Sequence, residues 1–458
     1  MRNRRLLWVS AAVAGCLAIA CATVPAIAAG PPATALVKEG AALPGAPEEI
    51  VSSINNSAVN KVGGYSFTVN TTGSGTTLSH AWGDALGGVG TVIRTEGTFG
   101  DYQQTSWESF FGMSNAGKIA YSPSCTHVPS GTTGLDGVWL DDTVVMIEEQ
   151  AYPHMANWYW SFGSRPGVTA DDVPHWVGGI TDTLGGSTDN RGLFYGFNAT
   201  PLLLGGDTVP DLPYVLSTSS TVSFDYRFSA FGAHYLAEAQ MSSGSSLNDN
   251  AMVLDGQGLM LGGSLVREDS PLPAAVGGLP GEVWDNFDYL SVTEDGHWLM
   301  TGDSNDAGTT TDEFLMVDGQ IILREGDTLP SGLVLASSMG GAFMNEDGDW
   351  AVNWYVNLDG TNRECIIVNG EFILAETFEV DWDGDGIPDE NAILMDITGT
   401  NALTVGDRMP DGSFDVYFTG DVSVDGGSNL EAGFRITIPE PSALALLAIG
   451  ALTFLRRR

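Results

Sequence analysis

Short apolar runs joined by Asp-Gly or Asn-Gly turns recur along the chain. Residues 314–323 read FLMVDGQIIL, and residues 365–374 read CIIVNGEFIL. Two turn residues that need positive φ between apolar runs predict a β-hairpin. The corresponding turn residues are spaced by 57, 57, 57, 63 and 51 positions, and they are Asp84, Asp141, Asn198, Asp255, Asp318 and Asn369. This spacing predicts a structural repeat of about 57 residues.

A second type of hairpin follows in each repeat, with a polar turn before an aromatic strand. Residues 345–350 read NEDGDW and residues 293–298 read TEDGHW, and looser copies occur elsewhere. The stretch between Trp158 and Thr183 does not align with the others. Two hairpins in each repeat predict four-stranded sheets.

The first hairpin is complete six times, and the seventh copy is divided between the two ends. Residues 432–438 correspond to its first strand, and residues 34–39 to its second. Pairing of the two ends would bury two open sheet edges. We therefore expect an all-β fold in which residues 33–438 form a seven-bladed β-propeller, closed by pairing of the N- and C-terminal strands. A β-solenoid and tandem β-sandwiches remain alternatives.

Acidic segments follow the first hairpins, most clearly at residues 324–330 (REGDTLP). Their carboxylates could form a ring around a central channel. Alternatively, each carboxylate caps a turn or pairs with an adjacent basic residue, and the candidates are Lys38, Arg94, Arg267 and Arg324. These basic neighbours favour the structural interpretation.

The N-terminus has the pattern of a secretory signal. Arg2, Arg4 and Arg5 precede an apolar run, and the small residues 26–29 provide a site for signal peptidase. We therefore interpret residues 1–29 as a signal peptide. The sequence Val-Ala-Gly before Cys16 resembles a lipoprotein box, so a surface lipoprotein carrying a lipid on Cys16 is an alternative.

The C-terminus combines three features within about twenty residues. Pro439, Glu440 and Pro441 precede 14 mainly apolar residues, and Arg456, Arg457 and Arg458 end the chain. As a helix, the apolar run would reach about 21 Å, which is short of the roughly 30 Å of a bilayer core. The order resembles the PEP-CTERM sorting signal of Gram-negative bacteria. The alternative is a simple C-terminal anchor.

The resemblance implies how residues 439–458 are processed. An exosortase would recognise this tail and cut near Pro439, Glu440 and Pro441. The protein would then reach the cell surface or the extracellular polymer matrix. Contact with the membrane would be transient and limited to the terminal segments.

Charge narrows the range of partners. The 458 residues carry a net charge of −39, and residues 30–438 keep 12 basic and 56 acidic residues, a net −44. Electrostatic repulsion excludes nucleic acid as a partner.

Two cysteines remain outside the signal peptide, Cys125 and Cys365. The exported compartment permits a disulfide, but the sequence leaves open whether they pair.

One acidic cluster has the spacing of a calcium loop. Residues 381–390 read DWDGDGIPDE, with oxygen ligands at positions 1, 3, 5 and 9 and glycine at position 6. The run resembles the loops of dockerin and thrombospondin type 3 repeats, although Ala392 stands at position 12 instead of glutamate. We expect calcium as a cofactor, held by Asp381, Asp383, Asp385, the carbonyl of Ile387, and Asp389.

Catalytic motifs are missing from the sequence. It contains no Gly-x-Ser-x-Gly elbow, no phosphate-binding loop and no His-Glu-x-x-His zinc helix. Trp158, Trp160 and Trp176 could stack on sugars, although packing between blades is the more common role of tryptophan. We expect a secreted, non-enzymatic binding or structural protein, with extracellular polysaccharide as a possible partner. A polysaccharide hydrolase or lyase is the alternative.

Overall fold

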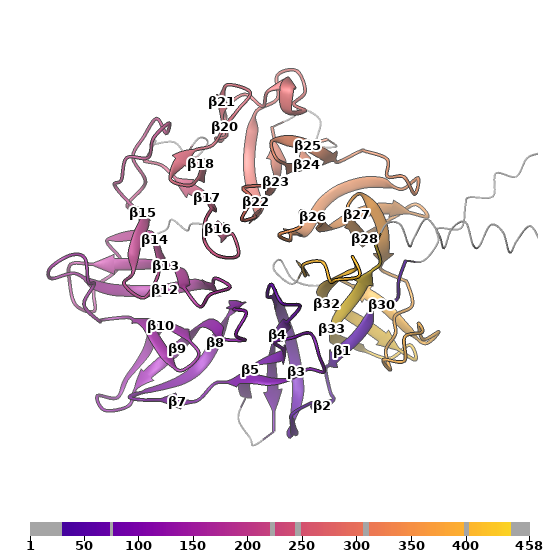
Figure 1. The fold of residues 1–458 in the computed structure, drawn as a ribbon, viewed down its shortest axis with the longest axis horizontal. Helices are drawn as coiled ribbons and strands as arrows, with labels where there is room; N and C mark the ends of the chain where they lie inside the picture. Colours follow the sequence, from indigo (N-terminus) through magenta and orange to yellow (C-terminus); the bar gives the residue numbers. More distant parts are fainter. Residues whose placement is uncertain are drawn as a thin grey trace, which may run out of the picture.

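Seven β-sheets are arranged as blades around a central axis (Figure 1). The computed structural model describes residues 30–73, 77–219, 225–242, 249–305, 311–397 and 403–440. The expected signal peptide, Cys16, Pro441 and Arg456, Arg457 and Arg458 lie outside these residues. In the described part, one short 3-10 helix, η1 (Ala274–Val276), accompanies the strands, and no helix is long and apolar enough to cross a membrane.

Each of the first four blades is an antiparallel sheet of consecutive strands. Blade 1 consists of β2 (Ala42–Leu43), β3 (Ala46–Val59), β4 (Tyr65–Thr72), β5 (Thr77–Asp84) and β6 (Thr91–Thr95). Blade 2 consists of β7 (Thr98–Phe99), β8 (Tyr102–Met113), β9 (Ile119–His127), β10 (Thr132–Leu140) and β11 (Thr143–Ile147). Blade 3 consists of β12 (Tyr159–Val168), β13 (Pro174–Thr181), β14 (Asn190–Tyr195) and β15 (Thr200–Leu204). Blade 4 consists of β16 (Asp225–Phe228), β17 (Tyr235–Gln240), β18 (Asn250–Leu254) and β19 (Gln257–Gly258).

The remaining blades complete the circle. A small hairpin, β20 (Met260–Leu261) and β21 (Ser264–Leu265), precedes blade 5. Blade 5 consists of β22 (Trp284–Val292), β23 (Trp298–Ser304), β24 (Glu313–Val317) and β25 (Gln320–Arg324). Blade 6 consists of β26 (Val334–Met344), β27 (Trp350–Leu358), β28 (Thr361–Val368) and β29 (Glu371–Ala375). Blade 7 consists of β30 (Ala392–Asp396), β31 (Thr404–Val405), β32 (Phe414–Val424), β33 (Asn429–Ile438) and β1 (Thr34–Lys38).

The two ends of the body meet in blade 7. Strand β1 pairs with β33 in antiparallel register, from Thr34 opposite Arg435 to Lys38 opposite Ala432 (Figure 1). Both strands bury apolar side chains at this junction, including Ala35 and Phe434. The predicted propeller and its closure by the terminal strands are therefore confirmed. The alternative of an open solenoid would have left these edges unpaired.

The chemistry of the outer turn explains the repeat. Asp318 has φ 48° and Gly319 has φ 76°, and Asn369 and Gly370 have the corresponding values of 50° and 84°. The side chains of these turn residues also cap the neighbouring strand, because Asp318 Oδ1 accepts the Trp298 N–H at 2.9 Å. Both requirements restrict the position to Asp or Asn. The same turn recurs at Asp141 and Asp255, whereas the predicted turn residues Asp84 and Asn198 do not have positive φ.

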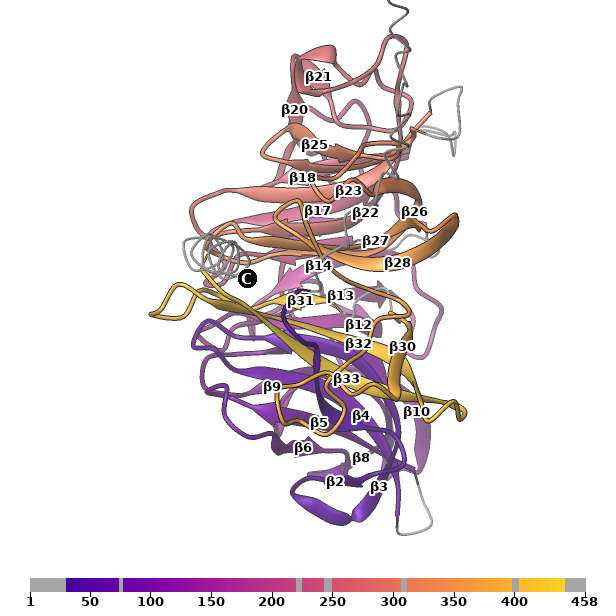
Figure 2. The same cartoon turned by 90° about the vertical axis from the view of Figure 1, so that its right-hand side faces the viewer.

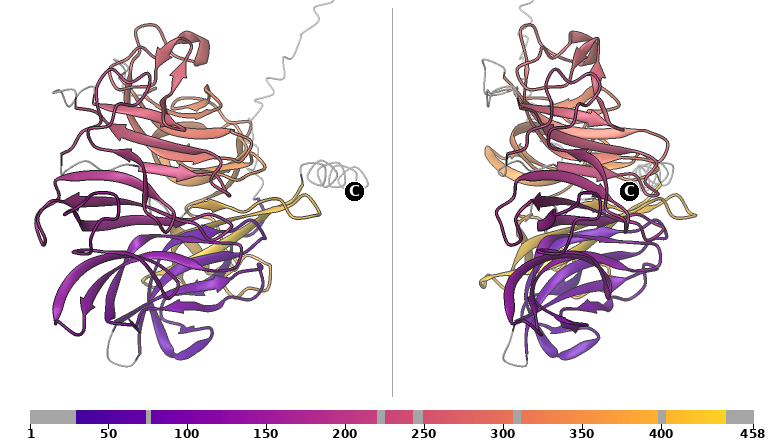
Figure 3. Two further views of the ribbon diagram at one scale, coloured as in Figure 1. Left: turned by 60° about the vertical axis from the view of Figure 1, so that its left-hand side comes forward. Right: turned by 90° about the vertical axis from the view of Figure 1, so that its left-hand side faces the viewer.

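The two hairpin turns of each of the first six blades lie on one face of the ring, because the strands alternate in direction. We call it the turn face and the other side the loop face, and the blades cross the thickness between them (Figures 2 and 3). The stretch that the sequence left unaligned is an ordinary pair of inner strands, β12 and β13. Their turn is closed by a Thr169 N–H bond to the Val173 carbonyl.

Candidate functional site

The innermost strands of the blades surround a cavity of about 190 Å³ on the axis. Its wall is formed by β3, β8, β12, β16, β22 and β26, together with β31. The wall combines polar groups with aromatic and aliphatic side chains, which include Phe110, Met113, Phe228, Tyr289 and Phe343. The ring of blades therefore places a concave surface of mixed polarity at its centre, and concave pockets are the common form of a ligand site.

Buried polar residues form the inner turns at the turn-face end of the cavity. Six of the seven turns begin with an Asn, Ser or Thr whose side chain accepts a backbone N–H four or five residues later, and the turn of blade 7 begins with Gly406. For example, Asn345 Oδ1 accepts the Asp349 N–H at 2.8 Å, and Thr293 Oγ1 accepts the His297 N–H at 3.0 Å. The equivalent residues are Asn60, Ser114, Thr169 and Ser229, and all six are at most 2% exposed. Capping fixes the direction of the next residue in each turn.

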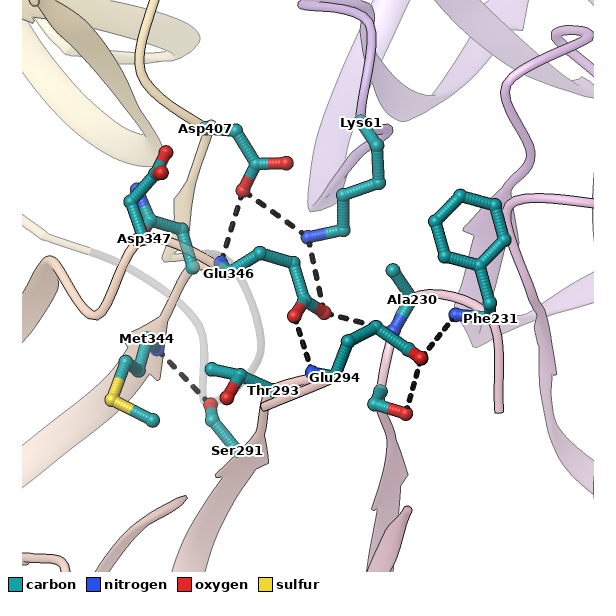
Figure 4. A network of polar contacts seen from close by, with 12 residues as sticks. Lys61, Ala230, Phe231, Ser291, Thr293, Glu294, Met344, Glu346, Asp347 and Asp407 are labelled. Carbon is teal, nitrogen blue, oxygen red and sulfur yellow. Dashed lines mark hydrogen bonds and ion pairs between the residues drawn. The ribbon is translucent and has the colours of Figure 1, made fainter. Parts of the chain in front are cut away.

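These next residues form a chain of hydrogen bonds around the axis, which we call the hub ring. It consists of Lys61, Asn115, Ala170, Ala230, Glu294, Glu346 and Asp407, one from each blade. On its carboxylate side, Glu346 accepts the N–H of Ala230 at 2.8 Å and that of Glu294 at 2.6 Å (Figure 4). Asp407 accepts the Glu346 N–H at 3.0 Å and the Lys61 Nζ at 3.3 Å.

The other side of the hub ring uses mainly the backbone. The Lys61 N–H donates to Asn115 Oδ1 at 2.9 Å, and the Asn115 N–H donates to the Ala170 carbonyl at 3.1 Å. The Ala170 N–H continues to the Ala230 carbonyl at 2.6 Å. The hub ring therefore links all seven blades and forms the floor of the cavity at the turn face.

Charged side chains lie on the other side of the cavity, beside a second hollow of about 240 Å³. We call them the collar, and they are Arg165, Arg227, Asp225 and Asp288. Arg165 forms an ion pair with Asp225, and its guanidinium lies 5.1 Å from the ring centre of Phe110. Arg165 has φ 50° at an irregularity of β12, which is an uncommon conformation for a large side chain.

Burial changes the titration of groups around the collar. Burial, and then the charges of Glu268 and Asp288, raise the pKa of Glu238 to about 8. Burial and Asp303 raise the pKa of Asp288 to about 6. Burial lowers the pKa of His175 to about 3, so its ring is neutral and bonds to the Tyr226 hydroxyl at 3.1 Å. Of these two carboxylates Asp288 lines the hollow, and a perturbed carboxylate in such a place is a common property of functional sites.

The predicted calcium loop brings three of its carboxylates together. Oxygens of Asp381, Asp383 and Asp385 all lie within 4.8 Å of one another. Asp381 is fully buried, and its two oxygens accept the Gly384 and Gly386 N–H groups at 2.8 and 3.0 Å.

The other two expected ligands of this loop differ in their placement. Asp389 Oδ2 accepts the Trp382 and Asp383 N–H groups, so it supports the loop backbone. The Ile387 side chain is 65% exposed. A second group with the same compactness consists of Glu364, Glu376 and Asp396 in blades 6 and 7, and Glu376 pairs with Arg363 at 3.4 Å.

Three of the acidic segments have a structural role. Glu96 accepts the Ser79 N–H at 3.1 Å, and Glu148 and Glu268 accept the Asp136 and Asn250 N–H groups of a neighbouring strand. These carboxylates bind strand N–H groups instead of turns, and the expected pairing with adjacent basic residues is wrong. Arg324 pairs instead with the buried Glu282, because neighbouring residues on a strand point to opposite faces.

The other sequence candidates lie in the core, except Trp158, which is partly buried and packs against it. Trp176 is fully buried and Trp160 is 4% exposed, and both pack around Phe194, so they offer no platform for a sugar. Cys125 and Cys365 are both free and buried, in blades 2 and 6. The collar arginines were not singled out by the sequence. Their only signal is that two of the few basic residues of the body lie on inner strands.

Comparison with known proteins identifies the C-terminal signal. Residues 437–458 match the PEP-CTERM protein-sorting motif, so the predicted motif is confirmed, and it marks a protein that an exosortase sorts to the outside of the cell. No curated protein matches the chain. Among solved structures, a subtype N11 neuraminidase-like protein of A/flat-faced bat/Peru/033/2010 (H18N11) is similar at a TM-score of 0.34 and 7% identity, over 90% of this chain and 94% of that one.

Proposed function

We propose that this protein is an exported, non-enzymatic binding protein that holds part of an extracellular polysaccharide at the centre of its propeller. An exosortase would deliver it to the cell surface or the polymer matrix of a Gram-negative bacterium. The collar is the observation that carries the proposal, because it places Arg165, Arg227, Asp225 and Asp288 beside Phe110 and Tyr289. Aromatic faces pack against sugar rings, carboxylates accept hydrogen bonds from hydroxyls, and guanidinium groups bind acidic sugars.

A retention assay tests this function. The exported protein is incubated with neutral and acidic polysaccharides, and both retention and glycan chain length are recorded. We expect retention without shortening, and weaker retention by Arg165→Gln. Arg363→Gln is the matched control, because Arg363 is also ion-paired but lies in blade 6 away from the axis. Equal retention by both variants would refute the role of the collar.

One observation favours the alternative of a polysaccharide hydrolase or lyase. Because burial raises its pKa to about 8, Glu238 is protonated at neutral pH close to the ionisable Asp288. A neutral carboxylic acid beside a carboxylate is the pair that general acid catalysis uses. Shortened glycan chains in the assay, lost in Glu238→Gln, would establish the enzyme instead.

The termini of the native protein test its sorting. Mass spectrometry is expected to find an N-terminus near Gly30 and a C-terminus near Pro439. A lipid on Cys16 would establish the lipoprotein alternative, and an intact Arg458 would contradict exosortase cleavage.

We also propose that calcium binds the loop at residues 381–389. The convergence of Asp381, Asp383 and Asp385 supports this, as do the glycine N–H groups that hold Asp381 in place. Calcium would draw the three carboxylates together and fix the loop beside β1, which the Asp381 backbone contacts through Ala33 and Ala35. Its role would be to stabilise the closing blade.

A further inference from the structure

The hub ring closes the central cavity at the turn face. One oxygen of Glu346, Oε1, accepts the Ala230 N–H at 2.8 Å and lies 3.7 Å from the Nζ atom of Lys61 (Figure 4). Lys61 belongs to blade 1 and Ala230 to blade 4, and these blades lie on opposite sides of the ring. An atom that contacts both of them lies near the axis. Within the part of the chain that the structure describes, these contacts therefore occupy the centre of the cavity floor.

The cavity continues in the opposite direction, toward the loop face. The cavity of about 190 Å³ and the second hollow of about 240 Å³ share five lining residues, which are Phe110, Arg165, Tyr226, Arg227 and Tyr289. The collar arginines therefore lie between two hollows that adjoin along the axis, and we call the two hollows together the axial pocket. The second hollow extends to Asp225, where β16 begins at the loop face.

The part of the axial pocket between the collar and the hub ring has the size of a small group. Pockets for drug-sized ligands span roughly 300–1,000 Å³. At about 190 Å³, this part accommodates a group about as large as one sugar ring.

The wall of this part has the chemistry that a sugar needs. The hydroxyls of Ser57 and Thr404 bond to each other at 2.8 Å, and Ser291 Oγ accepts the Met344 N–H at 3.1 Å. Phe343 adds an aromatic side chain to the same wall. Hydroxyl groups exchange hydrogen bonds with sugar hydroxyls, and aromatic rings pack against the apolar faces of sugars.

Arg165 is held in a strained conformation at the junction of the two hollows. Its φ is 50°. Its backbone is fixed on both sides, because Glu108 accepts its N–H at 3.3 Å and its carbonyl accepts the Tyr226 O–H at 2.5 Å. Strained residues persist only where their surroundings determine them, and they cluster at ligand sites. The strain therefore lies where a ligand passes from one hollow to the other.

We propose that the axial pocket binds the end of a polysaccharide chain, with the terminal sugar between the collar and the hub ring. The next sugars pass the collar toward the loop face. A groove open at both ends accepts an internal segment of a chain, whereas a pocket closed at one end accepts only a terminus. This inference rests on the proposed function and names the part of the polymer that binds.

Linear oligosaccharides of increasing length test the terminal site. Calorimetry measures the binding of oligomers of alginate, a uronic acid polymer, and of pullulan, a neutral glucan, to the full exported protein. We expect one protein per chain and a molar affinity that stays constant as the chain lengthens. An internal segment would give values that rise with length, because a longer chain offers more sites, and this result would overturn the proposal.

The failure of this inference differs from the failure of the proposed function. Binding that rises with length, or no binding of either oligomer series, overturns the terminal site. The proposed function fails only if no polysaccharide is retained in the retention assay.

A variant in the closed part of the pocket shows whether the terminal sugar enters it. Phe343→Trp adds volume to the wall there, and we expect it to weaken the binding of oligomers of every length about tenfold or more. Phe197→Trp is the matched control, because Phe197 is 53% exposed directly after β14 in blade 3. Melting temperatures show whether both variants keep the fold, and the length series depends on neither. Equal binding by Phe343→Trp and the wild type would overturn the proposal, since a sugar held at the collar alone does not reach Phe343.

Discussion

The Nζ atom of Lys61 lies 3.3 Å from a carboxylate oxygen of Asp407, and this contact joins blade 1 to blade 7 at the axis (Figure 4). The same ammonium group is 3.7 Å from Glu346 in blade 6. The ring is therefore closed twice, by β1 and β33 toward its outer side and by Lys61 at its centre. Because Lys61 faces two carboxylates that also accept backbone N–H groups, its charge balances the hub ring.

Removal of this charge should destabilise the whole propeller. Lys61→Met leaves Glu346 and Asp407 close together without a cation, and we expect a loss of about 1–3 kcal/mol in the free energy of unfolding. Lys118→Met is the matched control, because Lys118 pairs with Asp172 at a more exposed position and should cost under about 1 kcal/mol. Denaturant unfolding measures both, and equal effects would contradict a special role for the hub ring.

The blades could be predicted because their turns are restricted to a few residue types. Asp318 and Asn369 have positive φ and also cap a strand, and the same turn recurs at Asp141 and Asp255. The hub ring gives no such signal. Its members are as different as Lys61, Ala170 and Glu346, because each contacts a different neighbour and many of the bonds use the backbone.

Side-chain direction explains the wrong predictions. Arg324 and Glu325 are adjacent in sequence, but their side chains point to opposite sides of the sheet. Arg324 therefore pairs with Glu282 and not with Glu325. Arg165 lies at an irregularity of β12, where the alternation of side chains between the two faces of the strand is interrupted. The alternation of the sequence therefore does not predict that its side chain points toward the axis. Trp176 is in a strand that is buried along its whole length, so no alternation distinguishes exposed from packed positions.

The two cysteines should be inert in the folded protein. Cys125 and Cys365 are fully buried and free, and burial raises the pKa of Cys125 to about 11. Thiolate is the reactive form, so a thiol reagent should label neither residue at pH 8 until the protein unfolds. Spectroscopic thiol titration with and without denaturant measures this. A reducing agent should leave the melting temperature unchanged, and a drop would reveal a disulfide.

Stability should decrease toward alkaline pH because of Glu238. Its folded pKa of about 8 is above the unfolded value of about 4.5, so its contribution to stability is complete below pH 4.5 and is lost as pH rises through 8. The groups that act on it are Glu268, Asp288 and Asp249, which raise the pKa, and Arg165, which lowers it. Melting temperatures between pH 5 and 9 should fall less steeply in Glu238→Gln than in the wild type. An identical slope would place the titration in other residues.

The calcium loop is best tested at Asp383. Asp381 would be a poor choice, because its oxygens hold the Gly384 and Gly386 N–H groups and its loss would disturb the loop without any metal. Asp383 is exposed and its side chain accepts only the Asp385 N–H, so Asp383→Asn keeps the fold and removes one charged ligand. We expect calcium affinity at this loop to fall at least tenfold, or about 1.4 kcal/mol.

Asp359→Asn, in an exposed turn of blade 6, is the control and should bind calcium as the wild type does. Calorimetry measures both variants, and equal affinity in the two aspartate variants would remove Asp383 from the ligand set.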